Sequence, residues 1–397
     1  MKVVLADFRP VYLTEAVDQQ KLHECSVRFA EFVALADAAR DGSAVSDTPV
    51  TAIREAWDRY GVSPAHIRTR RILVLPDLEA AKDPADIDYA TIPFCRSFLE
   101  RAGGADISER LAIYRRHARA AVEKMYPDGE SPPDEAIHVS TTGYLLPSPL
   151  QELVSQKGWT QTVVSHCYHQ GCYGAFPAVR MAAGTLTAAA SGLTRQTARV
   201  DIAHTEICSI HAAPDCVDAE HIICDSLFAD GFIRYSAFTD EAFQTRGGRG
   251  LQVIRSAATT IPNSLEAMTW RPIANRFEMT LSAEVPRLIA KYVQPFIAGL
   301  LHDTGLDSPE EASRIVWVIH PGGPAIVELV GLCLGLSDDQ ISSGKDALRD
   351  GGNTSSATVP RIWDRLLQNP DVPPGTPVVS MAFGPGLTAA ALVTRVV

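Results

Sequence analysis

Apolar residues recur along this chain with two different periods, and their alternation predicts strands interleaved with helices. Runs rich in β-branched and aromatic residues predict strands at 2–8, 136–140, 162–167, 199–208 and 232–238. Apolar positions at helical spacing between these runs predict helices at 14–38, 53–60, 107–126, 150–157, 173–190 and 219–228. Strands separated by helices are typical of a layered α/β sheet with helices on both faces.

A glycine-rich segment from Thr245 to Gly250 predicts a boundary between two halves of the chain. Beyond it the pattern predicts strands at 251–261, 276–282, 315–319, 378–383 and 389–396. Helices are expected at 285–301, 325–334 and 354–367. We therefore expect an N-terminal half at 1–249 and a C-terminal half at 250–397 with a similar order of elements.

Composition and charge narrow the class of protein. The chain has 397 residues, 46% of them hydrophobic, and a formal net charge of -11. An acidic protein lacks the basic face that nucleic acids and anionic membranes require, so we expect neither as a partner. No secretory signal and no run of roughly 18 apolar residues is present. The eight cysteines are scattered, so we expect reduced thiols in a cytoplasmic protein.

Cys172 lies where a predicted strand turns into a predicted helix. Gly171 and Gly174 flank it, and Pro177 suits the first turn of the following helix. A helix N-terminus favours an anion, so this position predicts a thiol with a lowered pKa. The alternative is that Cys172 is a small buried hydrophobe, as free cysteines commonly are.

Two polar residues of the second half complete a chemically sensible set with Cys172. His320 follows an apolar strand and precedes a Pro/Gly turn, and Asn353 follows two glycines, where a helix cap is the structural alternative. A histidine can pair with a thiolate, and His and Asn N–H groups can donate to a developing oxyanion or enolate.

Five segments, in this order, resemble those of the type III polyketide synthases, the chalcone synthase-like branch of the thiolase superfamily. They are Gln170-Gly171-Cys172, Ser226-Leu227-Phe228-Ala229-Asp230-Gly231, Ile319-His320-Pro321-Gly322-Gly323-Pro324-Ala325, Gly352-Asn353-Thr354-Ser355-Ser356-Ala357 and Phe383-Gly384-Pro385-Gly386-Leu387. The resemblance extends over nearly the whole chain. It implies a thiolase-like five-layered αβαβα fold and a homodimer that uses acyl-coenzyme A and malonyl-coenzyme A.

The resemblance also implies roles for individual residues. Cys172 takes the starter acyl group, while His320 and Asn353 bind the malonyl thioester carbonyl and stabilise the enolate formed on loss of carbon dioxide. The enolate extends the chain, which then cyclises to a pyrone, a resorcinol or a similar ring. No cofactor and no metal are expected, since coenzyme A thioesters are substrates.

Further positions follow from the same resemblance. Phe228 matches a gatekeeper between the coenzyme A tunnel and the cavity, and Met279 stands at the second gatekeeper position, where the family has phenylalanine. Leu146 falls where a residue crosses the dimer interface. The cavity and its closing loop would include Thr142, His211, Ser355, Gly384, Pro385 and Gly386. The segment that meets the coenzyme A phosphates would be Arg68, Arg70 and Arg71, for which a solvated basic edge is the alternative.

Three other functions compete with this interpretation. A papain-like thiol hydrolase uses the same order of Cys, His and Asn, and Gln170 would suit its oxyanion donor. A binding module with zinc on His166, Cys167, His169 and Cys172 is disfavoured, because strand alternation places these side chains on two faces. A ketoacyl synthase would take its chains from an acyl carrier protein, and the Phe383-Gly384-Pro385-Gly386 loop favours the polyketide synthase over it.

Overall fold

Nine strands form one mixed sheet in the computed structural model, which describes residues 1–42, 47–75, 81 and 83–397. The order across the sheet is β11-β12-β13-β8-β1-β7-β6-β4-β5. These strands are β1 (Val3–Val11), β4 (Glu135–Ser140), β5 (Val163–Tyr168), β6 (Arg199–Glu206), β7 (Gly231–Thr239), β8 (Leu251–Thr260), β11 (Val316–Ile319), β12 (Pro377–Gly384) and β13 (Thr388–Val396). Strand β4 runs parallel to β5 and β6, and β11 runs parallel to β12.

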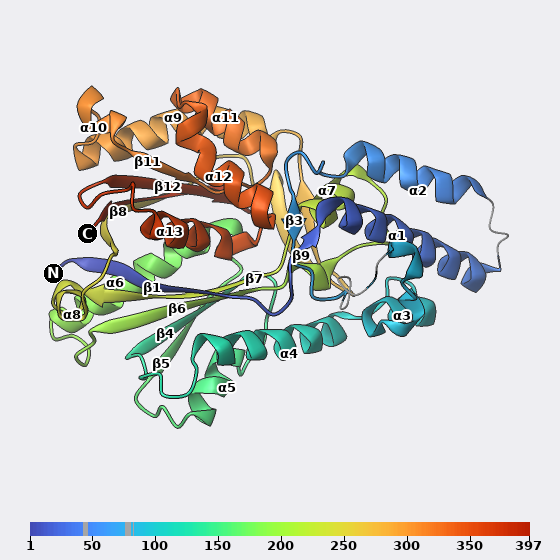
Figure 1. Cartoon of the computed structure of the whole chain (residues 1–397), viewed down its shortest axis with the longest axis horizontal. Coiled ribbons are helices and arrows are strands. Elements are labelled where there is room, and N and C mark those ends of the chain that lie inside the picture. Colours follow the sequence, from blue (N-terminus) through green and yellow to red (C-terminus); the bar gives the residue numbers. More distant parts are fainter. Residues whose placement is uncertain (43–46, 76–80, 82) are drawn as a thin grey trace.

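The sheet bends into two halves that meet where β1 pairs antiparallel with β8. Helices α6 (Ala175–Ala190) and α13 (Thr358–Gln368) lie between the halves (Figure 1). Helices α4 (Ile107–Met125) and α5 (Pro149–Gln156) cover one outer face, and α9 (Val285–Thr304) and α11 (Pro324–Leu334) cover the other (Figure 1). The five layers are therefore helix, strand, helix, strand and helix, as expected from the sequence.

Large side chains of the central helical layer are buried between the two half-sheets. Trp363 of α13 is fully buried, and its Nε1 donates to Ser380 Oγ at 2.8 Å. Its ring meets Phe176 of α6 and Tyr235 of β7 edge to face, with centroids 6.3 and 6.0 Å apart. Such aromatic contacts add to the burial of apolar area, so this layer fixes the two half-sheets against each other.

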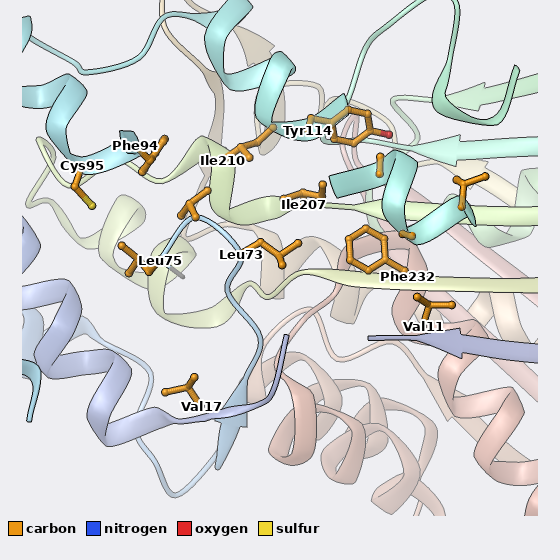
Figure 2. Packing of buried hydrophobic residues seen from close by; sticks show 14 of the residues in the cluster. Val11, Val17, Leu73, Leu75, Phe94, Cys95, Tyr114, Ile207, Ile210 and Phe232 are labelled. Carbon is orange, nitrogen blue, oxygen red and sulfur yellow. The ribbon is translucent and has the colours of Figure 1, made fainter. Parts of the chain in front are cut away.

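A second apolar cluster lies beneath the N-terminal helices α1 (Gln19–Asp41) and α3 (Pro93–Glu100). Figure 2 shows Ile207 and Ile210 in this cluster, near Leu73 and Phe232. Ile207 directly precedes the short 3-10 helix η4 (Cys208–His211), and Ile210 lies within it. Because close-packed side chains leave little freedom to move, the cluster holds η4 firmly beneath the cavity described below.

Several elements escaped prediction from the sequence. Helix α3 and strand β9 (Met268–Pro272) are short, while α8 (Asp240–Arg246) and α12 (Asp338–Gly351) are largely polar. The predicted helix at 354–367 is divided into η5 (Ser355–Ala357) and α13, because Ser355 adopts a φ of 51°. The remaining elements are α2 (Asp47–Tyr60), α7 (Ala219–Leu227), α10 (Pro309–Ser313), β2 (Val17–Asp18), β3 (Thr69–Arg70), β10 (Phe277–Leu281), η1 (Pro84–Asp86), η2 (Tyr89–Thr91) and η3 (Gly171–Tyr173).

In the parts of the chain that the structure describes, no helix combines the length and apolar character needed to cross a bilayer.

Candidate active site

Cys172 lies in η3, at the corner between β5 and α6. Gly171 has a φ of 67°, and its N–H donates to Thr141 Oγ1 at 3.0 Å. A Cβ atom at position 171 would lie 2.4 Å from Pro385 Cδ, so only glycine fits there. The corner is thus pressed directly against a loop from the other half of the chain.

That loop follows strand β12 and contains the predicted residues Gly384, Pro385 and Gly386. A Cβ atom on Gly384 would lie 2.5 Å from Tyr173 Cδ1. The Gly386 N–H donates to Met268 O at 3.2 Å and so ties the loop to β9. The structure therefore brings this loop and the Cys172 corner together, as the sequence predicts.

Asn353 lies beside Cys172 and is fully buried. Its Nδ2 is 3.9 Å and its Oδ1 4.0 Å from Cys172 Sγ. The Oδ1 atom accepts the Ser355 N–H at 2.9 Å, which fixes the orientation of the amide. With Oδ1 held in this way, Nδ2 is the group that can donate to a reacting atom at Cys172.

His320 is buried at the end of β11, with 1% of its surface exposed. Its backbone N–H donates to Met381 O at 2.8 Å, while neither ring nitrogen has a hydrogen-bond partner among the described residues. A buried polar group without a partner is uncommon and often marks a functional site. The imidazole is therefore free to donate to a substrate carbonyl.

Burial controls the charge state of this set. It raises the pKa of Cys172 to about 12, an effect that the Asn353 hydrogen bond opposes and the nearby Glu206 carboxylate reinforces. Burial also lowers the pKa of His320 to about 3. Both shifts favour the uncharged form of the side chain at neutral pH. The predicted low thiol pKa is not found, because Cys172 precedes the start of α6 at Ala175 and desolvation outweighs the helix dipole.

A pocket opens at Cys172, and its empty space together with the open solvent at its mouth is about 730 Å³. Six predicted positions besides Cys172 line it, namely Thr142, His211, Phe228, Met279, Ser355 and Pro385. Neither Asn353 nor His320 belongs to this lining among the described residues. The sequence therefore identified much of the pocket wall, and Asn353 reaches Cys172 from outside this lining.

Thr142 and His211 form a rigid part of that wall. Thr142 Oγ1 donates to Glu206 Oε2 at 2.9 Å and accepts the Ile207 N–H at 2.8 Å. His211 Nε2 donates to Thr142 O at 2.7 Å, and its Nδ1 accepts the Phe277 N–H at 3.1 Å. Because Nδ1 is an acceptor, the ring is neutral, in agreement with a pKa that burial lowers to about 3.

Trp270 and Glu206 are among the residues of the site that were missed from the sequence. Trp270 of β9 lines the pocket, and its Nε1 donates to Thr141 O at 2.9 Å. Glu206 is fully buried and accepts hydrogen bonds from Thr141 N, Thr142 N, Thr142 Oγ1 and Ser356 Oγ. The signal for Glu206 was a carboxylate at the end of an otherwise buried strand; Trp270 stands on a strand that was not predicted.

The three arginines at 68–71 have different surroundings. Arg68 is exposed and pairs with Asp350 at 3.0 Å, and Arg71 lies 4.2 Å from the centre of the Tyr12 ring. Arg70 is only 2% exposed; its guanidinium donates to Gln19 Oε1, Asp225 O and Phe228 O. With these donors engaged, Arg70 is not available to a phosphate, and the clamp expected from the sequence is reduced to Arg68 and Arg71.

Leu146 is 71% exposed and Tyr144 is 58% exposed. This placement leaves Leu146 free to meet another chain.

The four side chains of the alternative zinc site do not converge. Cys167 Sγ points toward Gly174 O at 3.9 Å in the core. Of the described residues, only Cys216, Asp218 and His221 form a group with the spacing of metal ligands.

Comparisons with known proteins agree with this geometry. The sequence model of the C-terminal domain of chalcone and stilbene synthases matches residues 252–397. The 1,3,6,8-tetrahydroxynaphthalene synthase of Streptomyces coelicolor is 26% identical over 299 residues, which cover 73% of this chain and 75% of that enzyme. The 3,5-dihydroxyphenylacetyl-CoA synthase of Streptomyces toyocaensis is 27% identical over 258 residues, 63% of each chain and so less than two thirds of that relative.

The fold is also that of solved structures. The C-terminal type III polyketide synthase domain of Steely1 from Dictyostelium has a TM-score of 0.76 at 19% identity and covers 100% of this chain and 99% of that one. This likeness confirms the thiolase-like fold. The C-terminal match and the relatives show that the chain is similar in sequence to type III polyketide synthases, and the solved structures show that it has their fold.

Proposed function

We propose that this enzyme loads an acyl starter on Cys172 and extends it by decarboxylative condensation with malonyl-coenzyme A. The observation that carries the proposal is the buried contact between Asn353 Nδ2 and Cys172 Sγ at 3.9 Å. A donor fixed next to the nucleophile, away from water, is placed to stabilise negative charge that develops during reaction.

The proposed reaction has two stages, acyl loading on Cys172 and extension by malonyl-coenzyme A. The Cys172 thiol gives up its proton, its sulfur attacks the thioester carbonyl of the starter, and coenzyme A leaves with a proton as a free thiol. Malonyl-coenzyme A next places its thioester carbonyl at the N–H groups of His320 and Asn353. Loss of carbon dioxide leaves the electron pair as an enolate, which attacks the acyl–Cys172 thioester and returns the thiol of Cys172 after protonation.

The neutral form of His320 suits this role. A neutral imidazole carries one N–H and donates it to the oxygen without first losing a proton. The enolate is stabilised by hydrogen bonds rather than by a full positive charge, and donors aimed at developing charge in a dry site are worth roughly 10²–10³ in rate each.

Substrate entry is assigned to the face that carries Arg68 and Arg71. Arg68 is exposed, and its guanidinium pairs with Asp350 at 3.0 Å, so a phosphate can compete for the guanidinium. Phe228 and Met279 line the same pocket as Cys172. Acyl-coenzyme A and malonyl-coenzyme A are the proposed substrates, with acyl carrier protein thioesters as the alternative donors.

A homodimer is part of the proposal. Leu146 and Tyr144 expose apolar surface beside the pocket wall at Thr142, where a second copy would bury it.

Cyclisation to a pyrone or a resorcinol would follow once the growing polyketide fills the pocket.

The proposal is tested by mass spectrometry of products formed from malonyl-coenzyme A and a panel of acyl-coenzyme A starters. We expect polyketides from the native enzyme and none from Cys172→Ala. Cys333→Ala, a change on α11, is the matched control and should retain activity. Product formation by Cys172→Ala would overturn the proposal. Turnover of carrier-protein thioesters alone would instead favour a ketoacyl synthase, and peptide cleavage without decarboxylation a thiol hydrolase.

A further inference from the structure

Three different metal-ligating side chains converge on the outer wall of the pocket. Cys216 Sγ, a carboxylate oxygen of Asp218 and a ring nitrogen of His221 all lie within 4.8 Å of one another. Cys216 and Asp218 lie just before α7, and His221 lies in its first turn. None of these groups takes part in the condensation proposed above.

Asp218 and His221 are held together by a hydrogen bond that a metal ion would replace, while the other Asp218 oxygen caps α7. Asp218 Oδ1 caps α7 by accepting the N–H groups of Glu220 and His221 at 3.1 and 3.2 Å. Its other oxygen, Oδ2, lies 2.7 Å from His221 Nδ1. One carboxylate oxygen therefore serves the helix, while the second faces the imidazole and the thiol.

The second nitrogen of His221 is oriented from outside the cluster. His221 Nε2 lies 3.3 Å from Glu278 Oε1 on β10. Metal-bound histidines commonly donate their other N–H to a carboxylate, which fixes the tautomer and strengthens the ligand. Glu278 is placed to do this if Nδ1 holds the ion.

The surroundings also suit a thiolate at Cys216. Arg276 is 4% exposed, and its Nη2 donates to Cys216 Sγ at 3.2 Å. Its charge is balanced by Asp215 at 3.2 Å and by Glu278 at 3.2 Å. A divalent cation would be neutralised by the thiolate and the Asp218 carboxylate, so the site would hold no uncompensated charge.

We propose that Cys216, Asp218 and His221 bind a divalent cation of the zinc class, with a fourth position open to water. One thiolate, one imidazole and one carboxylate form a donor set that Zn²⁺ accepts in tetrahedral geometry. Zinc binds the thiolate form of cysteine, so binding at neutral pH displaces the thiol proton to solvent.

Occupation of this site would tie three parts of the pocket wall together. The loop after η4 contributes Cys216, α7 contributes His221, and Glu278 links the ion to β10. His221, Arg276 and Glu278 line the same pocket as Cys172. The ion would thus stiffen the wall opposite the nucleophile without contacting the reacting atoms.

The test uses the full-length enzyme after chelation and dialysis. Zinc titrated by calorimetry in two buffers of different ionisation enthalpy should bind one ion per chain and release about one proton. Cobalt in its place should give a sulfur-to-metal charge-transfer band. Cys216→Ser should abolish that band. Cys216→Ser and His221→Gln should each weaken zinc binding by at least about tenfold, and Glu278→Gln should weaken it about 10–100-fold.

Matched controls come from residues of the same types elsewhere. Cys333→Ser changes another partly exposed cysteine, and His302→Gln changes a histidine that also pairs with an aspartate, Asp307, at 2.9 Å. Both should bind zinc as the native enzyme does. Circular dichroism and thermal unfolding check that each variant is folded. The proposal would be overturned if the native enzyme bound no zinc, or if Cys216→Ser and Cys333→Ser bound it equally. Neither outcome depends on whether the enzyme catalyses condensation at Cys172.

Discussion

Arg70 packs its side chain against Gly352, the residue before Asn353. A Cβ atom at position 352 would lie 2.8 Å from both Cγ and Cδ of Arg70, and Gly352 has a φ of 67°. The Arg70 guanidinium in turn donates to Phe228 O at 2.6 Å. A single buried arginine therefore positions both the Asn353 loop and a residue of the pocket, from a segment far away in sequence.

We expect Gly352→Ala to displace Asn353 and to reduce condensation strongly, because both the space and the backbone conformation exclude a side chain. Its unfolding free energy should fall by about 1–3 kcal/mol in denaturant titrations. Gly375→Ala is the control. Gly375 also has a positive φ, 87°, but has no atom within 4 Å of the added Cβ. Equal losses of activity in both variants would contradict the role of the Arg70 contact.

Asn353→Ala should separate acyl loading from extension. Removing the amide leaves Cys172 free to accept an acyl group but deletes a donor to the enolate, so decarboxylation should slow roughly 10²–10³-fold. Intact-protein mass spectrometry would follow the acyl-enzyme, and release of carbon dioxide from malonyl-coenzyme A would follow extension. Asn369→Ala is the control, because this asparagine also accepts a backbone N–H, that of Asp371, but lies on the surface away from the pocket lining. Loss of acyl-enzyme with retained decarboxylation would contradict the assignment.

Trp270→Ala should widen the range of starters. The Trp270 ring lies 5.3 Å from His211 and 5.8 Å from Phe277, so it occupies space next to the pocket. Removing the indole would add volume, and longer acyl-coenzyme A starters should then be extended. Trp270→Phe keeps most of that volume but loses the Nε1 hydrogen bond to Thr141 O. Longer products from Trp270→Phe as well would show that the hydrogen bond, rather than the volume, limits the starter.

The stability of the fold should fall as the pH is lowered from about 6.5. Burial lowers the pKa of four histidines to about 3, namely His138, His204, His211 and His320. Their folded pKa lies below the unfolded value of about 6.5, so the stability that they confer above pH 6.5 is lost as the pH falls toward 3.

Two buried carboxyls act in the opposite direction. Burial raises the pKa of Asp225 and of Asp230 to about 6, so their contribution is present below pH 4 and is lost as the pH rises through 6. Near pH 5, unfolding lets the four histidines bind protons and lets the two carboxyls release them. Because there are more histidines, the net result is proton uptake on unfolding. Urea titrations between pH 7.5 and 5 should show a falling midpoint; a constant or rising midpoint would contradict the buried neutral histidines.

Much of the fold was predictable because its strands are short apolar runs. The corner at Cys172 was also predictable, since its glycines mark the turn directly. Helix α12 was not, because only one narrow stripe, which includes Ile341 and Leu348, is buried, although the Ser337–Gln340 capping box marked its start. The burial of Arg70 could not be seen at all. Its partners Gln19, Asp225 and Phe228 are far away in the chain, and only the folded structure brings them together.

The position of β1 has a consequence for biosynthesis. Val3 pairs with Thr239 and with Val253, so its first partner follows 239 - 3 = 236 residues later. During translation this apolar strand has no strand partner until more than half of the chain has left the ribosome. Unpaired strand edges associate readily with other chains, and such distant contacts form slowly. We expect the nascent chain to engage chaperones, and its yield in cells to depend on them more than the stability of the finished enzyme would suggest.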